Sequence, residues 1–324
     1  MKYRMLGNTG INISEIGFGA WGIGGLTKGR SSYGPTDDDE SKRALSAAFE
    51  QGVTFYDTSD IYGYGHSEEL IGDALGSVRD KIVIASKVGF LEHLGPQDFS
   101  PKHVRTSIEQ SLKRLRTDYI DLYQLHDPDI DLLINDSSIL QTFEALKKEG
   151  KIRTVGISVK GPDEGVRVIR ELNTAVIQIN LNMIDHRAIE NGLLDLAKEK
   201  SVGIIARTPL CFGFLSDRKV EQLHPRDHRT SRPPEQLKRW QSAQDLFGSM
   251  NKGRSRTFAQ LALQFCLSSP AVSTVIPGML KVSEVMENVS ASKIGFLSEQ
   301  ELSRIREIYK THSFFAPNAR QKIL

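Results

Sequence analysis

Short apolar runs alternate with longer amphipathic stretches along this 324-residue chain. Runs of about four to seven residues, rich in β-branched side chains, predict strands at 15–19, 53–57, 81–86, 119–125, 152–158, 175–180, 202–206 and 273–276. The stretches between them predict helices near 39–51, 66–76, 101–115, 138–149, 162–171, 188–199, 256–267 and 281–289. Eight strands, each followed by a helix, predict an α/β fold of the (β/α)8 TIM barrel type, because a doubly wound sheet normally has about five or six strands.

A long segment at about 213–255 interrupts this alternation between the seventh strand and the helix that follows it. It contains a Pro233–Pro234 pair, and the pattern predicts an extra helix over 234–249. Long loops without structure of their own are usually functional or mobile. We expect residues 1–324 to form a single barrel domain that carries this loop insertion.

Charge and cysteine content argue against several classes of protein. Lysine plus arginine number 42 and aspartate plus glutamate 40, so the formal net charge of +2 provides no basic field for nucleic acid. The two cysteines, Cys211 and Cys266, form no metal-binding motif, and we expect free thiols in a reducing cytoplasm. Because no apolar stretch approaches about 18 residues, we expect a soluble protein with no membrane partner.

Three predicted strands bring a titratable residue to their C-terminal ends. Asp57 ends the second strand, and Tyr62 follows shortly after it. Lys87 ends the third strand and His126 ends the fourth. Barrel enzymes collect their catalytic groups at this end of the strands, so we expect these side chains to share one site.

These four residues suit the reduction of a carbonyl group, which needs a hydride donor and a proton donor. The phenol of Tyr62 is a weak acid, with an ordinary pKa of about 10. A nearby ammonium, here Lys87, would lower that pKa, and Asp57 would keep the ammonium charged and oriented. His126 would then bind the substrate oxygen, as an electrophile or as a proton relay.

Two other interpretations of the same residues are open. Asp57 and Lys87 could form a buried ion pair that only holds strand ends together, with Tyr62 at the rim of the pocket. Alternatively, Asp57, His126 and the carboxylates of Asp127 and Asp129 are ligand types that barrel hydrolases use for metals. An ammonium at the same point repels a dication, so the sequence predicts no metal site.

The segment FYDTSDIYGYGHSEELIGDAL, at 55–75, resembles the first motif of the aldo-keto reductase family. The resemblance extends from about Tyr3 to about Asn288. It implies a barrel that uses NAD(P)H to reduce a small-molecule aldehyde or ketone, such as a sugar, with Tyr62 as the general acid and base. Potassium-channel β subunits share this fold, so a cofactor-binding regulatory subunit is the alternative. No glycine-rich GxGxxG or GxxxxGK[ST] motif follows a strand, so a dinucleotide would not bind in the Rossmann manner.

The resemblance also implies contacts to the nicotinamide end of the cofactor. Ser158 and Gln178 match two residues that bind the carboxamide, whereas Val159 replaces an asparagine that binds it in many relatives. Both side chains could instead satisfy backbone groups at strand ends. Arg207 replaces a tyrosine that stacks on the ring, and its positive charge would favour the reduced, uncharged ring. It could instead pair with a carboxylate at the surface.

Further cofactor contacts are expected after the seventh and eighth strands. The first group comprises Thr208, Leu210 and Gly213, and the second comprises Gly278, Lys281, Glu284, Glu287 and Asn288. Glycine and a helix N-terminus suit the phosphates of the cofactor. The resemblance to the family favours NADP(H). The carboxylate of Glu284, however, would repel a 2′-phosphate, and Leu280 offers that phosphate no hydrogen bond, so NAD(H) is plausible. Glu284 could also be an ordinary solvated helix residue.

The last two expectations concern the substrate pocket and the insertion. Trp21 follows the first strand and is expected to line the substrate pocket, although a tryptophan of the core would show the same pattern. The insertion is rich in cations, namely Arg218, Lys219, Arg226, Arg229, Arg232, Lys238 and Arg239. Such a flap could bind cofactor phosphates or an anionic substrate, but a solvated face is the more ordinary explanation.

Overall fold

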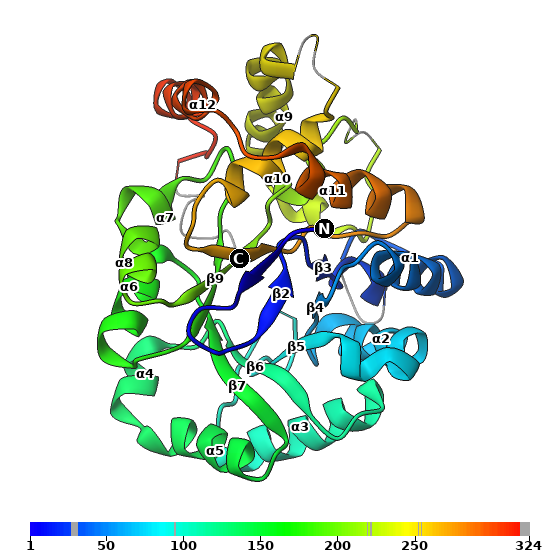
Figure 1. The fold of residues 1–324 in the computed structure, drawn as a ribbon, viewed down its shortest axis with the longest axis vertical. Coiled ribbons are helices and arrows are strands. Elements are labelled where there is room, and N and C mark those ends of the chain that lie inside the picture. The colour runs from blue at the N-terminus through cyan, green and yellow to red at the C-terminus, as the bar shows by residue number, and fades with distance from the viewer. Residues whose placement is uncertain are drawn as a thin grey trace.

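Eight parallel strands form the centre of the molecule in the computed structural model, which describes residues 1–26, 32–93, 95–218, 220, 222–251, 253 and 255–317 (Figure 1). They pair in sequence order: β3 (Phe18–Gly19), β4 (Phe55–Asp57), β5 (Val83–Val88), β6 (Ile120–His126), β7 (Ile152–Ser158), β8 (Val176–Asn180), β9 (Gly203–Arg207) and β10 (Val272–Val275). The eight predicted strands are confirmed, with ends that differ by a few residues.

The sheet closes on itself between β3 and β10. Parallel bridges join Ile16 to Val275 and Gly19 to Gly278, and the backbone amide of Gly17 donates to the carbonyl of Val275 at 2.8 Å. A Cβ at Gly19 would lie 2.6 Å from the carbonyl oxygen of Ile276, so a larger residue would push these strands apart. The closure confirms the predicted (β/α)8 barrel.

Helices surround the strands as an outer layer (Figure 1). The predicted ones correspond to α1 (Asp38–Glu50), α2 (His66–Leu75), α3 (Pro101–Leu115), α5 (Ser137–Lys148), α6 (Pro162–Glu171), α8 (Leu193–Glu199), α10 (Phe258–Leu267) and α11 (Val282–Ile294). The helix predicted at 188–199 is wrong in one respect. Gly192 has a φ of 80°, which breaks the segment into α7 (Arg187–Glu190) and α8.

Some elements have no counterpart in the prediction. Strands β1 (Tyr3–Met5) and β2 (Asn12–Ser14) form an antiparallel hairpin, and helices α4 (Ile130–Asn135) and α12 (Glu299–Thr311) follow β6 and α11. The hairpin packs Leu6, Ile11 and Ile13 against the apolar side chains inside the barrel, including Phe55 and Leu122. It therefore closes the end of the barrel opposite the strands' C-terminal ends.

The insertion after β9 has a helix of its own. Helix α9 (Pro234–Gly248) confirms the extra helix predicted over 234–249, and Figure 1 shows it beside α12. Its Trp240 is buried against Phe212 and Phe214 near the start of the insertion. The amide of Gln236 donates to the carbonyl of Phe314 near the C-terminus. Among the described residues, no helix is long and apolar enough to cross a membrane.

Candidate active site

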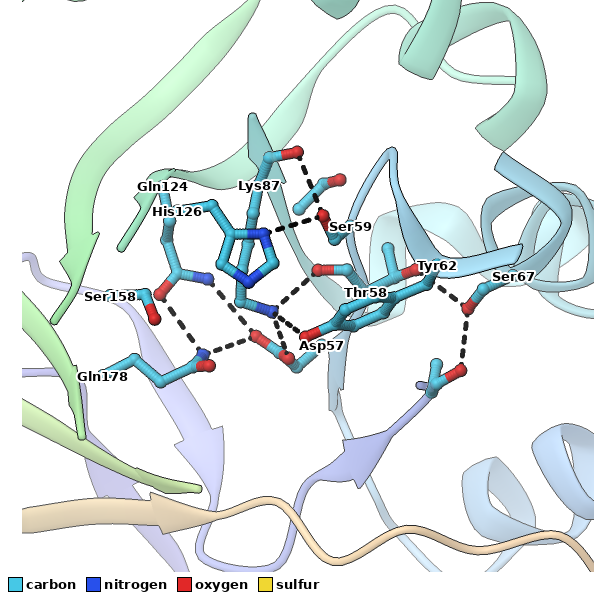
Figure 2. Close-up of polar contacts among 12 residues, drawn as sticks. Asp57, Thr58, Ser59, Tyr62, Ser67, Lys87, Gln124, His126, Ser158 and Gln178 are labelled. Carbon is cyan, nitrogen blue, oxygen red and sulfur yellow. Dashed lines mark hydrogen bonds and ion pairs between the residues drawn. The ribbon is translucent and has the colours of Figure 1, made fainter. Parts of the chain in front are cut away.

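Polar side chains meet at the C-terminal ends of the strands, directly above the apolar interior of the barrel (Figure 2). Alternate residues of a strand point to the same face, so Leu122 of β6 belongs to the apolar layer while Gln124 and His126 extend into the polar one. The neighbouring strands β4 and β5 contribute Asp57 and Lys87, whose side chains meet in this layer. The structure therefore brings together the residues that were predicted from strand ends.

Lys87 and Asp57 form a buried ion pair. The Lys87 Nζ lies 2.5 Å from the Asp57 Oδ1, and the side chains are 0% and 2% exposed. The ammonium also donates to the carbonyl oxygen of Thr58 at 2.9 Å and to the Tyr62 Oη at 3.3 Å. Three acceptors therefore fix the position of a charge that water does not reach.

Tyr62 lies in a tight turn between β4 and α2. It begins the short helix η2 (Tyr62–Gly65), in which Gly63 has a φ of 63°. A Cβ at Gly63 would lie 2.4 Å from the carbonyl oxygen of Gly24, so only glycine fits this close approach. The turn directs the phenol back toward the ends of β4 and β5, as Figure 2 shows.

The pKa of Tyr62 differs from the sequence-based expectation. Burial raises this pKa and outweighs the lowering effect of the Lys87 charge, so its net shift is upward and not downward. Burial also lowers the pKa of Lys87, but the attraction of Asp57 and Tyr62 more than offsets this, and the net pKa is raised. The phenol is therefore neutral at physiological pH and the ammonium is charged.

His126 is a buried, neutral imidazole. Burial, together with the charges of Lys87 and Arg207, holds its pKa well below the usual value. The ring centroid lies 5.9 Å from that of Tyr62, and the Nδ1 lies 3.2 Å from the Ser59 Oγ. Because Nδ1 has a partner within the protein, Nε2 is the nitrogen left to bind another molecule.

Two glutamines hold the second carboxylate oxygen of Asp57. The Gln178 Nε2 donates to the Asp57 Oδ2 at 2.7 Å, and the Gln124 Nε2 donates to the same oxygen at 3.2 Å. The predicted cofactor contact Gln178 lines the cavity but is also a partner of Asp57. Gln124 was missed, although its position two residues before His126 in β6 places it on the same face of the strand.

Ser158 lies deeper than its predicted role requires. It is fully buried, is absent from the cavity lining, and its hydroxyl donates to the Asp127 Oδ1 at 2.9 Å. Asp127 does line the cavity and also lies 3.5 Å from the guanidinium of Arg207. Ser158 therefore acts on the cavity indirectly, through its hydrogen bond to the carboxylate of Asp127. The alternative of an arginine at the surface is wrong, because Arg207 is 14% exposed and lies within the site, but the carboxylate partner of that alternative is present as Asp127.

A cavity of about 600 Å³ opens above these residues. Most predicted site residues line it, namely Trp21, Asp57, Tyr62, His126, Gln178, Arg207, Thr208, Leu210, Gly213, Gly278, Glu284, Glu287 and Asn288. Lys87 lies beneath it, in contact with Tyr62 and Asp57. Lys281 does not line it, because it is an exposed residue at the N-cap of α11, and its contact with the cofactor stays a prediction.

Glu284 has a partner that the sequence did not reveal. Its Oε1 lies 2.5 Å from a guanidinium nitrogen of Arg218, and its Oε2 accepts a hydrogen bond from the backbone amide of Leu280. The side chain is only 8% exposed, so the solvated helix residue considered above is wrong. The pair connects the insertion to α11 across the cavity and offsets the charge of the carboxylate.

Aromatic rings form the other end of the cavity. Trp21 stacks on His93 at 6.1 Å and meets His228 edge to face at 4.6 Å. Tyr33 and Phe212 lie 5.2 and 4.9 Å from the same His228 ring. Trp21 is therefore a cavity residue, as predicted, and the four rings around it could not be recognised from the sequence because they lie far apart along the chain.

His228 is the polar member of this wall. It is 8% exposed, and its Nδ1 lies 3.2 Å from the carbonyl oxygen of Ser32. Burial lowers its pKa to about 4, so the ring is neutral. Its Nε2 has no hydrogen-bond partner among the described residues. A neutral imidazole that donates from Nδ1 presents an acceptor at Nε2, which suits a hydroxyl group of a bound molecule.

The basic residues of the insertion fall into two groups, one that lines the cavity and one that lies on the surface. Arg229 and Arg232 line the cavity and are partly buried, so the solvated face favoured from the sequence is wrong for these two, whereas Arg218 lines the cavity but is 54% exposed. Arg229 is held by a bidentate ion pair with Asp227. Arg239 pairs with Glu235 on the surface of α9, as expected for a solvated face, and Lys219 lies outside the described residues.

Comparison with known proteins identifies relatives along nearly the whole chain. The model of the "Aldo/keto reductase family" matches residues 15–310. L-galactose dehydrogenase from Arabidopsis thaliana is 33% identical over 300 residues, which cover 90% of this chain and 88% of that protein. An uncharacterized oxidoreductase of Bacillus subtilis, YqkF, is 30% identical over 321 residues, which cover 96% and 99% of the two chains.

Solved structures agree with these matches. The holo form of aldo-keto reductase AKR11C1 from Bacillus halodurans superposes with a TM-score of 0.79 at 30% identity and covers 99% of both chains. Glycerol dehydrogenase AKR11B4 from Gluconobacter oxydans gives a TM-score of 0.80 at 27% identity and covers 98% of this chain and 97% of that one. These neighbours share the barrel described above.

Proposed function

Since this chain belongs to the aldo/keto reductase family and is an NAD(P)-dependent oxidoreductase, we propose that it reduces an aldehyde or ketone to the alcohol with Tyr62 as the proton donor. One observation carries the proposal. The Lys87 ammonium touches both the Asp57 carboxylate and the Tyr62 phenol at the floor of the cavity. A phenol that releases a proton there leaves a phenolate beside a fixed positive charge.

Proton transfer from Tyr62 depends on the two groups behind it. Its raised pKa keeps the phenol protonated while a carbonyl compound binds. As negative charge develops on the carbonyl oxygen, the phenol gives up its proton and the new phenolate is stabilised by Lys87. Asp57, held by Gln124 and Gln178, keeps the ammonium in place and charged. His126 binds the same carbonyl oxygen through its Nε2.

The residues around the cavity fit a nicotinamide cofactor, which supplies the hydride when bound. Arg207 has a buried Nε without a hydrogen-bond partner among the described residues, so this edge of the guanidinium is free to face a ligand. Gly278 and the first turns of α11, with Glu287 and Asn288, line the opposite end. We assign the nicotinamide to the Arg207 end and the adenosine to the α11 end.

The choice between NADP(H) and NAD(H) depends on Glu284. The family prior favours NADP(H), whereas the carboxylate alone would favour NAD(H). Its pairing with Arg218 offsets the repulsion of a 2′-phosphate, so we propose that the enzyme accepts NADP(H) and retains some use of NAD(H).

The aromatic wall favours a substrate with both an apolar face and hydroxyl groups. Trp21, Tyr33 and Phe212 provide flat surfaces, and the Nε2 of His228 provides a hydrogen-bond acceptor among them. We therefore propose a polar carbonyl compound such as a sugar or a hydroxylated aldehyde. L-galactose dehydrogenase and L-glyceraldehyde 3-phosphate reductase, both among the relatives, are named for substrates of this kind.

The test is a screen of aldehydes and ketones with NADPH and NADH, using wild type and Tyr62→Phe. General acid catalysis contributes about 10²- to 10⁴-fold, so we expect Tyr62→Phe to lose at least about 100-fold in kcat while cofactor affinity stays within about twofold. Tyr64→Phe is the matched control, because it removes a phenol two residues away that does not line the cavity. A Tyr62→Phe variant with more than about a tenth of the wild-type kcat would refute the assignment.

A further inference from the structure

The hydroxyl of Ser59 connects His126 to a carboxylate outside the site described so far. Its Oγ lies 3.2 Å from the His126 Nδ1 and 3.2 Å from the Asp60 Oδ1 (Figure 2 labels the serine and the histidine). Ser59 is fully buried, so water does not compete for its hydroxyl. A third acceptor, the carbonyl oxygen of Lys87, lies further away at 3.5 Å.

The single hydroxyl proton of Ser59 can point only one way at a time. If it points to Asp60, the Ser59 oxygen accepts from His126, so the imidazole carries its proton on Nδ1 and Nε2 is an acceptor. If it points to His126, Nδ1 is the acceptor and the proton lies on Nε2. Only the second tautomer can donate a hydrogen bond to a substrate carbonyl, which has no proton of its own.

We propose that Asp60 acts through Ser59 as a positioning residue that selects the tautomer of His126. A protonated Asp60 donates to Ser59, Ser59 donates to the His126 Nδ1, and Nε2–H faces the substrate. An ionised Asp60 accepts a hydrogen bond from Ser59. The two hydrogen bonds that join Asp60, Ser59 and His126 then run in the opposite direction, and the imidazole proton lies on Nδ1. The inference rests on the proposed reduction, in which His126 binds the carbonyl oxygen.

The two states differ by one proton, and transfers along the hydrogen bonds from His126 through Ser59 to Asp60 account for that difference. When Nε2 loses its proton to solvent, Ser59 passes its hydrogen to Nδ1 and takes the hydrogen of Asp60. Asp60 is left as the carboxylate, and no other group changes charge. The reverse steps restore the donating tautomer when a proton returns to Nε2.

The surroundings of Asp60 favour its protonated form. Burial of its carboxyl group and then the negative charge of Glu68 raise the pKa of Asp60 to about 8. Glu68 accepts hydrogen bonds from Ser86 at 2.5 Å and from Arg114 at 2.7 Å. The charged and titratable groups beside Asp60 are Glu68, Arg114 and Tyr123. Those beside His126 are Tyr62, Lys87, His93 and Arg207.

The tautomer can be measured directly by ¹⁵N NMR of histidine-labelled protein, with the His126 signals assigned from a His126→Gln variant. We expect the wild type to carry the proton on Nε2 at about pH 6 and on Nδ1 at about pH 10, with a midpoint near 8. The Asp60→Asn variant should keep one tautomer of His126 throughout, since the side-chain amide does not titrate over this range. A wild-type ring with the same tautomer at both extremes would overturn the proposal. Because this measurement needs no turnover, it is independent of whether the proposed reduction is correct.

Steady-state rates provide the second measurement. About nine-tenths of Asp60 is ionised one pH unit above its pKa, so kcat for reduction should fall about tenfold between pH 7 and pH 9 in the wild type and less than about twofold in Asp60→Asn. In a Ser59→Ala background the Asp60→Asn change should no longer alter the profile, because the connection is cut. Ser67→Ala, which removes another buried hydroxyl near β4, is the control and should keep the wild-type profile. An Asp60→Asn profile that stays the same as the wild type would count against Asp60.

Discussion

A guanidinium nitrogen of Arg218 lies 2.5 Å from the Glu284 Oε1, and this ion pair links the insertion after β9 to helix α11 across the cavity. One member belongs to a loop and the other to the helix expected to face the adenosine of the cofactor. If the adenosine binds at α11 as proposed, a 2′-phosphate would meet the charge of the pair and not that of the glutamate alone.

The first prediction concerns cofactor choice. Glu284→Gln removes the carboxylate and releases Arg218, so NADPH should bind about fivefold to tenfold more tightly while the Kd of NADH changes less than about twofold. Titration of each cofactor by fluorescence measures both values. Glu307→Gln removes a carboxylate from the exposed pair with Arg304 and serves as the control. Equal changes for both cofactors would show that Glu284 does not face the phosphate.

The second prediction separates chemistry from structure at Lys87. Lys87→Met leaves Asp57 unpaired in the interior, so it should lose stability, by about 3 to 5 kcal/mol, as well as activity. The double variant Asp57→Asn, Lys87→Met contains no buried charge at this place and should recover most of the stability. If Lys87 serves Tyr62, the double variant stays at least about 100-fold below the wild-type kcat. Recovery of both stability and kcat would mean that the pair is only structural.

The third prediction concerns substrate recognition by His228. His228→Phe keeps the ring packing against Trp21 while it removes the nitrogen acceptor. One neutral hydrogen bond contributes about 0.5 to 1.5 kcal/mol, so KM for a hydroxylated substrate should rise about twofold to tenfold with little change in kcat. A substrate without hydroxyl groups is the control and should show no such rise. An equal rise for both substrates would assign His228 to packing alone.

The fourth prediction is a loss of stability in acid. Burial lowers the pKa of His186 to about 3 and that of His228 to about 4, whereas an unfolded histidine titrates at about 6.5. The unfolded chain therefore binds more protons below about pH 6.5, and stability falls as the pH decreases from there, by up to about 1.4 kcal/mol per pH unit for each such histidine. Denaturant unfolding at pH 7 and pH 5 measures the difference.

His186→Phe isolates one of these histidines. The ring stacks between Phe265 and Tyr309, away from the cavity, so phenylalanine can replace it in shape. The variant should lose less stability than the wild type between pH 7 and pH 5. His312→Gln changes an exposed histidine and should behave as the wild type. The prediction is wrong if His186→Phe shows the wild-type dependence on pH.

Much of the barrel could be predicted because its strands are apolar runs of regular length and spacing. The hairpin β1–β2 could not, since its strands have three residues each and β1 is largely exposed, which leaves no periodic pattern to detect. The prediction joined α7 and α8 into one helix, whereas the positive φ of Gly192 separates them. A glycine within a helical pattern does not show from the sequence whether its φ is positive.

The site likewise contains residues that could be predicted from the sequence and residues that could not. Asp57, Lys87 and His126 could be found because a strand fixes the position of its last residue. Lys281 could not be placed, because one position at a helix N-cap decides whether a side chain faces the cavity or solvent. His228 was missed since its location depends on the path of a long insertion, and that path is fixed by contacts from distant parts of the chain.

Helix α9 depends on the last described residues of the chain. Gln236 binds the carbonyl of Phe314 and the amide of Ala316, and Arg239 binds the carbonyl of Ser313. These bonds join positions that are 74 to 80 residues apart in the sequence, so α9 is held by a segment outside the barrel sheet. Trp240 of α9 packs on Phe212, which lines the cavity, so a substitution that loosens residues 313–316 would reach the binding site through α9 without touching the barrel.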